Sequence, residues 1–232
     1  MRISRKFFVS AGAIGLTAAA LPATSNAQSS PPATLHFHVL EPSEFDRAGM
    51  MRILETSKRN KQVFQSVSPL TVGGVASVYL HMQNSLNAFE FSLNQGPGSL
   101  ATLAVMTGPS IVFALPDSLW QKYKFGDAFK LAPTNVYYTA KSLRRTASPD
   151  DPDGIYQDWS AQAVLHRGGA FMVCHNAMTA VAGLIAQGAG LQPHDVLSDF
   201  EHNILPGFHV VPAGVAATQL AIQHGWSPYT II

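Results

Sequence analysis

The sequence predicts an α/β fold with a mostly parallel central sheet. Short apolar runs, typical of buried strands, are followed by polar turns and then by segments with helical periodicity. Residues 168–182 show this order most clearly, because the apolar run 170–173 leads through Cys174-His175-Asn176 into small, helix-favouring residues. The composition agrees: 47% of the residues are hydrophobic and only 12% are charged, which is enough apolar surface for a substantial core.

Residues 1–27 have the pattern of a secretory signal peptide, with a basic start, an apolar middle over 7–21 and small residues before Ala27. The start also resembles the twin-arginine export signal, with Lys6 in the place of the second arginine. The apolar span is too short for a stable membrane anchor. We therefore expect an exported, periplasmic protein that is cleaved near Ala27, and a disordered lead-in over 28–34.

Removing residues 1–27 takes away three basic residues and no acidic one, so the formal charge changes from +1 to −2. No helix or stripe rich in Lys and Arg remains, and no nucleic-acid partner is expected. The remaining chain is of ordinary single-domain size, and we expect one domain over 35–232. The only cysteine excludes an intrachain disulfide.

The longest predicted element is an amphipathic helix over 75–93, in which apolar residues recur every three or four positions. Its opposite, polar face carries Gln83, Asn84, Asn87 and Glu90. The other predicted elements, in chain order, are a strand over 35–40, a helix over 47–64 capped by Ser43 or Asp46, a buried parallel strand over 100–106, an apolar run over 111–115, a short helix capped by Asp117, a helix over 156–165, the strand over 170–173 with its helix, a helix starting at Pro193, a strand over 209–211, a helix over 215–224 and an edge strand over 226–232.

Residues 126–158 form a long insertion rich in Pro, Asp, Tyr and Thr. A loop of this length in a compact domain is either mobile or covers a site, and the sequence leaves both open. Its acidic centre lacks the spacing of a calcium loop. His36 and His38 share one strand face but have no third ligand nearby, and no haem attachment motif occurs, so neither a metal nor a cofactor is expected.

Cys174 is the candidate catalytic residue, because a thiol between a strand end and a helix start tends to have a lowered pKa and to act as a nucleophile. The alternative is that it is a small apolar filler, since free cysteines are often buried. His175 would be its proton partner or a local cation, and Asn176 would hold the turn or donate a hydrogen bond. Alternatively, both residues only satisfy backbone groups at a turn.

A ligand pocket is predicted beside this cysteine at the carboxyl ends of the strands, where α/β sheets gather ligands. Its walls would be His81, Asn84, and Gly108 and Ser110 of the turn 107–110. The tight turn of Pro212 and Gly214 follows the strand 209–211 at the same sheet edge. Such a pocket would hold a small polar ligand.

The second half of the chain resembles the DsrE/DsrF-like (YchN-like) superfamily. The matching positions are Val173, Cys174 and Asn176, then Leu205-Pro206-Gly207, then Val210 to Val215, then Gln223 with Gly225-Trp226. The resemblance covers about the last 65 residues and implies a three-layer α/β sandwich with a sheet of about five strands, assembly into homo-oligomers, and a cysteine that carries sulfur as a persulfide. His175 stands where the family has glycine or another small or polar residue, and the predicted export and the insertion depart from cytoplasmic sulfur-relay members.

Two functions follow from these observations. In the first, the chain is an exported protein that binds or relays small sulfur species, as sulfane sulfur, through Cys174. In the second, it is a non-catalytic module of the same fold that binds a small polar ligand or serves in oligomeric assembly.

Overall fold

The computed structural model describes residues 36–231, so the predicted signal peptide, the lead-in, Leu35 and Ile232 lie outside the described residues. The five strands of the main sheet are β1 (Asn60–Ser66), β4 (Leu100–Met106), β5 (Ala170–Cys174), β6 (Phe208–Val211) and β7 (Ser227–Ile231), and β2 (Thr71–Val72) pairs with β3 (Val75–Ala76) in a small hairpin. The helices are α1 (Arg47–Leu54), α2 (Ser77–Asn87) with its π-helical continuation η1 (Ala88–Ser92), the 3₁₀ segments η2 (Gly108–Ala114) and η3 (Ile155–Gln157), α3 (Asp117–Tyr123), α4 (Phe125–Phe129), α5 (Ala161–His166), α6 (His175–Ala189), α7 (Pro193–His202) and α8 (Gly214–Gln223).

The main sheet is parallel throughout, in the order β6-β5-β4-β1-β7. Every residue of β4 is buried, as expected for an apolar strand covered on both faces. β7 lies at one edge, where the missing N–H of Pro228 is tolerated.

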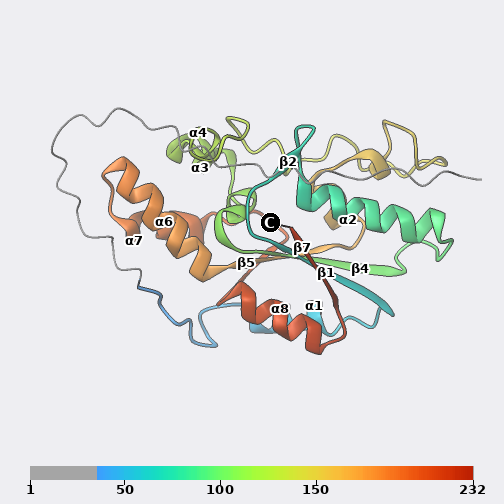
Figure 1. Cartoon of the computed structure of the whole chain (residues 1–232), viewed down its shortest axis with the longest axis horizontal. Helices are drawn as coiled ribbons and strands as arrows, with labels where there is room; N and C mark the ends of the chain where they lie inside the picture. Colours follow the sequence, from blue (N-terminus) through green and yellow to red (C-terminus); the bar gives the residue numbers. More distant parts are fainter. Residues whose placement is uncertain (1–35, 232) are drawn as a thin grey trace, which may run out of the picture. The chain divides into compact units, whose positions relative to one another are not determined.

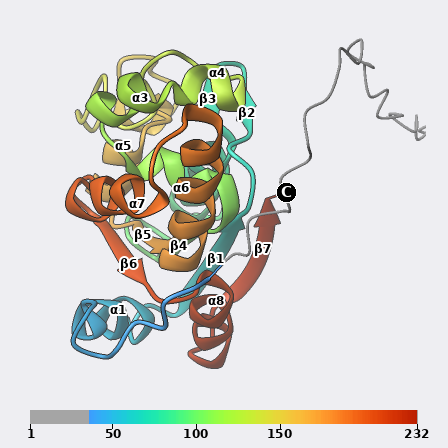
Figure 2. The ribbon, with the colours of Figure 1, turned by 90° about the vertical axis from the view of Figure 1, so that its left-hand side faces the viewer.

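Helices cover both faces of this sheet, so the fold has three layers (Figures 1 and 2). One face packs against α1 and α8 through side chains such as Met172, and the other packs against α2 and α6 through Phe171 and Val173. This alternation from Ala170 to Val173 follows from the two-residue repeat of a strand. The predicted α/β three-layer sandwich with a parallel sheet of five strands is confirmed.

The chain crosses the sheet in two directions. From β1 it proceeds outward through β4 and β5 to β6, and the connecting helices, including α2 and α6, lie on one face. From β6 it returns to the far side of β1 as β7, through α8 on the opposite face. Because parallel crossovers are right-handed, reversing the direction of travel moves the connecting helix to the other face.

Several predicted elements near the amino end need correction. His36 to Leu40 do not form a strand, and Val39 is exposed, so the alternating pattern there has no core to face. The first strand is β1, in a stretch that we predicted as the end of a helix; that helix, α1, stops at Leu54. Only Val63 and Phe64 of β1 are apolar, and its polar first half hid the strand pattern.

Three smaller expectations can also be settled. Asp46 caps α1, where its side chain accepts a hydrogen bond from the amide of Gly49 at 2.8 Å. The apolar run 111–115 is mostly 3₁₀ helix η2 and not extended. Asp117 is the first residue of α3 and not its cap, and its carboxylate accepts from the amide of Asn135 at 2.6 Å.

The insertion (residues 126–158) packs against the helices through buried polar anchors. The side-chain amide of Asn135 donates to the carbonyls of Phe113 (3.0 Å) and Leu115 (2.8 Å). The carboxylate of Asp158 accepts from the amides of Lys141 (2.5 Å) and Ser142 (2.8 Å). The bonds of Asn135 tie the insertion to η2 and the residue after it, whereas those of Asp158 link two parts of the insertion to each other.

Candidate functional site

Cys174 stands where β5 ends and α6 begins. It is the N-cap of α6, and its Sγ accepts a hydrogen bond from the amide of Ala177 at 3.3 Å. The strand and the helix predicted around this residue are therefore present. The residue is only 6% exposed, so the thiol lies at the edge of the core rather than open to solvent.

This position is a topological switch point of the sheet. The chain leaves β5 into α6 on one face, and it leaves the adjacent strand β6 into α8 on the opposite face (Figure 2). Cys174 pairs in register with Val211, and the amide of Asn176 donates to the carbonyl of Pro212 at 3.3 Å. Ligands of open α/β sheets bind at such points, because the two connections separate and leave a crevice between them.

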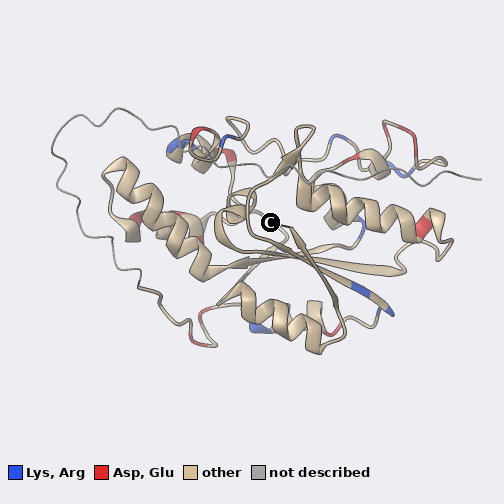
Figure 3. Cartoon of the chain, in the orientation of Figure 1, with Lys and Arg blue, Asp and Glu red and all other residues tan. Residues whose placement is uncertain are grey.

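The start of α8 packs directly on the cysteine. A Cβ added to Gly214 would lie 2.3 Å from Cγ2 of Thr107 and 3.1 Å from Cβ of Cys174. Only glycine permits this approach, and it brings the amino ends of α6 and α8 together. Neither helix carries an Asp, Glu, Lys or Arg residue (Figure 3), so these two helices contribute backbone amides and helix dipoles here and no such charged side chain.

The turn after β4 also lies at the carboxyl ends of the strands, but its polar side chains already form hydrogen bonds with the backbone. The hydroxyl of Ser110 donates to the carbonyls of Ser66 (2.6 Å) and Thr107 (2.8 Å). Gly108 has a φ of +54°, and a Cβ there would lie 2.9 Å from the carbonyl oxygen of Val67. These two residues fix the ends of β1 and β4 relative to each other, and Ser110 is fully buried.

His175 points to a partner on α7. Its Nε2 lies 2.7 Å from Oε1 of Glu201, and the residue is 2% exposed. Its Nδ1 is buried with no hydrogen-bond partner among the described residues. Both residues line a cavity of about 470 Å³, together with His38, Glu44 and His202 among others. The ring is thus paired with Glu201 and makes no hydrogen bond to the cysteine sulfur.

Two of the residues predicted as walls lie elsewhere. The ring of His81 lies 5.4 Å from that of Tyr229 on β7, and two strands, β1 and β4, separate β7 from β5. Asn84 is exposed on α2. The structure therefore brings together Cys174, Asn176 and the α8 start, and leaves His81 and Asn84 apart.

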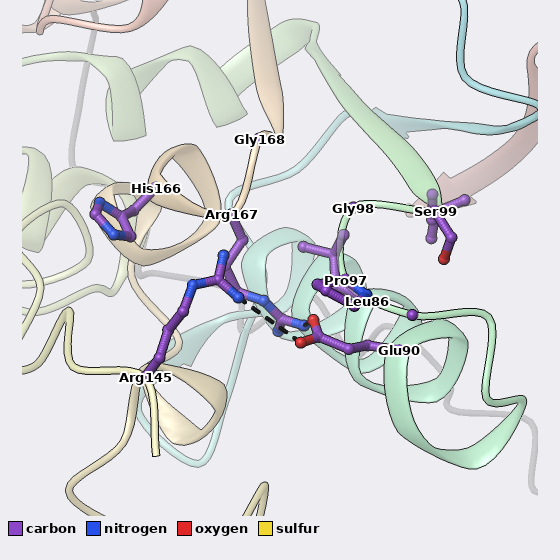
Figure 4. Close-up of a pocket in the computed structure, with 11 residues that line it drawn as sticks. Leu86, Glu90, Pro97, Gly98, Ser99, Arg145, His166, Arg167 and Gly168 are labelled. Atoms are coloured by element: carbon purple, nitrogen blue, oxygen red, sulfur yellow. Dashed lines mark hydrogen bonds and ion pairs between the residues drawn. The ribbon is translucent and has the colours of Figure 1, made fainter. Parts of the chain in front are cut away.

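A second polar group, which the sequence did not indicate, is built around Arg167 after α5 (Figure 4). Its guanidinium donates to Oε1 of Gln83 (2.8 Å), Oδ1 of Asn87 (2.5 Å) and Oε2 of Glu90 (2.9 Å). It also lies 5.0 Å from the ring centre of Tyr156. Burial lowers the pKa of Arg167, and its hydrogen bond to Glu90 opposes that shift.

The polar face of α2 is only partly on the surface, and Gln83 shows this most clearly. It is fully buried, and its amide donates to the carbonyls of Ile155 (2.8 Å) and Asp158 (2.6 Å). The insertion covers this helix face and needs donors for its own carbonyls. The sequence signal that could have indicated this burial is the presence of Gln83, Asn87 and Glu90 at helical spacing, since amide side chains are suited to buried hydrogen bonds.

No protein-family model matches the chain, and no curated protein or solved structure shows significant similarity to it. The resemblance to the DsrE/DsrF-like superfamily therefore stays a prediction. Within residues 36–231, no three or more His, Cys, Asp and Glu side chains are placed to hold a metal ion. In the same part of the chain, no helix has the length and apolar character needed to cross a membrane.

Proposed function

We propose that this chain is a thiol protein that accepts sulfane sulfur on Cys174 and holds or relays it as a persulfide. The observation that carries the proposal is the place of the sulfur at the switch point between β5 and β6. There it faces the amide of Ala177, and the amino ends of α6 and α8 meet. The amino ends of helices are places where anionic groups bind, and a persulfide anion is such a group.

The proposed step needs no oxidant or cofactor. The thiolate of Cys174 attacks the outer sulfur of thiosulfate, and a new S–S bond forms as the S–S bond of thiosulfate breaks. Sulfite leaves with the electron pair of that bond. The enzyme-bound product is the persulfide anion, whose terminal sulfur takes the place next to the helix amides.

The neighbouring residues have distinct parts in the proposal. His175 is paired with Glu201 at 2.7 Å and lines a neighbouring cavity, and in the proposal the thiol proton leaves to solvent. Asn176 holds the turn through its amide, which donates to Pro212. His81 and Asn84 have no part, because they lie away from the sulfur.

We also propose that the protein is exported to the periplasm and assembles with copies of itself. Export rests on residues 1–27. Assembly rests on the resemblance to the DsrE/DsrF-like superfamily.

Mass spectrometry of the intact chain tests the sulfur proposal. After incubation with sodium thiosulfate or inorganic polysulfide, the protein should gain the mass of one sulfur atom, and a reducing agent should remove it. Cys174→Ser should gain none, whereas His175→Gln, which leaves the contacts of the sulfur unchanged, should still gain it. A chain that takes up no sulfur, with a thiol that alkylates like an ordinary buried cysteine, would overturn the proposal.

The burial of Cys174 favours the second function, a non-catalytic module that binds a small polar ligand, over a relay. In that case the cysteine is a helix cap and no more. Cys174→Ser, whose hydroxyl also accepts from an amide at an N-cap, would then leave both the stability and any ligand affinity nearly unchanged.

A further inference from the structure

A cavity of about 300 Å³ lies beside the amino ends of β4 and β5 (Figure 4). Cys174, in contrast, lies at the carboxyl end of β5. It is lined by Leu86, Glu90, the loop 96–100, Arg145, His166, Arg167 and Gly168. Its volume is at the lower end of those of small-molecule sites, so only a small ligand fits.

Two guanidinium groups reach one carboxylate in this cavity. Arg167 is bound to Oε2 of Glu90 at 2.9 Å, and its side chain is 2% exposed. Arg145 lies 3.7 Å from Oε1 of the same carboxylate, beyond hydrogen-bond distance, and its side chain is 48% exposed. Glu90 is thus committed to Arg167, and a positive charge is left over at Arg145.

The hydrogen-bond donors of Arg145 are unused. Among the described residues its guanidinium makes no hydrogen bond, whereas that of the adjacent Arg144 is paired with Asp151. The hydroxyl of Ser99 in the cavity lining is also buried without a hydrogen-bond partner. A positively charged fork and a buried hydroxyl without partners are the groups that an anionic ligand would satisfy.

The insertion holds Arg145 at this place. The carbonyl of Arg144 accepts from the amide of Ile155 at 2.8 Å, next to the 3₁₀ turn that is bound to Gln83. Across the cavity, Gly96 and Gly98 have positive φ values of 82° and 69°, which bend the loop that carries Ser99. The site is therefore built from three separate segments of the chain, each fixed by its own backbone bonds.

We propose that this cavity binds a small anion through a carboxylate or a tetrahedral oxyanion group. The fork of Arg145 contacts the anion in bidentate fashion, because a planar guanidinium matches both carboxylate and oxyanion geometry. The hydroxyl of Ser99 donates a further bond. The ion pair of Arg167 and Glu90 forms the rigid part of the cavity lining, and the insertion completes the site by contributing Arg145.

Isothermal titration of the full chain tests this proposal, with sodium phosphate, sodium sulfate and sodium malonate added separately at constant ionic strength in sodium chloride. At least one of the three should bind saturably. The malonate arm distinguishes a carboxylate from an oxyanion. Arg145→Gln should weaken that binding by about tenfold or more, as expected for loss of a charged bidentate contact. Arg144→Gln is the matched control, since it removes the same charge one residue away, and it should change the affinity less than about twofold.

Ser99→Ala is the second variant and should weaken the same anion several-fold without a change in charge. Thermal unfolding of each variant shows that it is folded before titration. The proposal fails if none of the three anions binds saturably, or if Arg144→Gln and Arg145→Gln weaken binding equally, which is the result of general charge screening. Cys174→Ser should leave the anion affinity unchanged, so the outcome is independent of the sulfur proposal.

Discussion

Replacing Arg167 by methionine should lower the free energy of unfolding by about 4 kcal/mol. The guanidinium is buried and donates to Gln83, Asn87 and Glu90 at 2.8, 2.5 and 2.9 Å. Removing one partner of a buried ion pair costs roughly 3–5 kcal/mol, and an orphaned buried acceptor costs roughly 1–3 kcal/mol. The three losses occur in one network and are not additive, and methionine retains packing against Tyr156, so the expected loss is smaller than their sum.

Urea denaturation, followed by tryptophan fluorescence, measures this loss. Arg144→Gln is the control, because the ion pair of Arg144 with Asp151 is exposed and should contribute less than about 1 kcal/mol. Adding Glu90→Gln to Arg167→Met should recover part of the loss, since the carboxylate then no longer needs a cation. A loss for Arg167→Met no larger than that for the control would refute the view that this network holds the insertion on α2.

Three further perturbations have distinct expected outcomes. Gly214→Ala should lower stability by about 1–3 kcal/mol, because the new Cβ would lie 2.3 Å from a threonine methyl carbon, whereas Gly188→Ala, with nothing within 4 Å, should raise the melting temperature. Asn135→Ala removes two buried hydrogen bonds of 3.0 and 2.8 Å; it should cost about 2 kcal/mol and speed proteolysis of the insertion, and an unchanged cleavage rate would contradict this. Lys122 holds the pKa of Asp199 below its usual value, so this carboxylate stabilises the fold above its unfolded pKa of about 4 and loses that effect as the pH falls through the lower folded pKa. Asp199→Asn should therefore reduce the loss of stability during acid titration, by less than about 1 kcal/mol because the groups are exposed.

The sequence was sufficient for those parts of the fold in which one local pattern decides the structure. β4 and β5 are apolar because both faces of each strand are covered, and α2 shows its inner face at helical spacing. β1 could not be recognised, because its central place in the sheet is defined by pairing with β4 and β7 and not by its own residues. Conversely, His36 to Leu40 alternate like a strand but find no neighbouring strand with which to pair.

The candidate site was likewise only partly predictable from the sequence. The order of strand, turn and helix places Cys174 at a helix start, and that much is local. Its close contact with Gly214 comes from the end of another strand, so no local pattern contains it. The environment of Arg167 depends on an insertion lying over α2, and only the tertiary structure shows which polar residues of that helix are covered.

The two proposed anion sites lie at opposite ends of the strands, and their separation predicts how they behave together. The proposed persulfide at Cys174 would lie against helix amides, whereas the proposed anion in the cavity of Arg145 would bind a guanidinium group. β5 has five residues, so its amino and carboxyl ends are roughly 16 Å apart at about 3.3 Å per residue. A sulfur species bound at Arg145 therefore cannot meet the thiol directly. In a chain that carries both Cys174→Ser and Arg145→Gln, the changes in stability should add to within about 0.5 kcal/mol. A larger deviation would show that the two ends are coupled through the sheet, and it would require one mechanism in place of two separate sites.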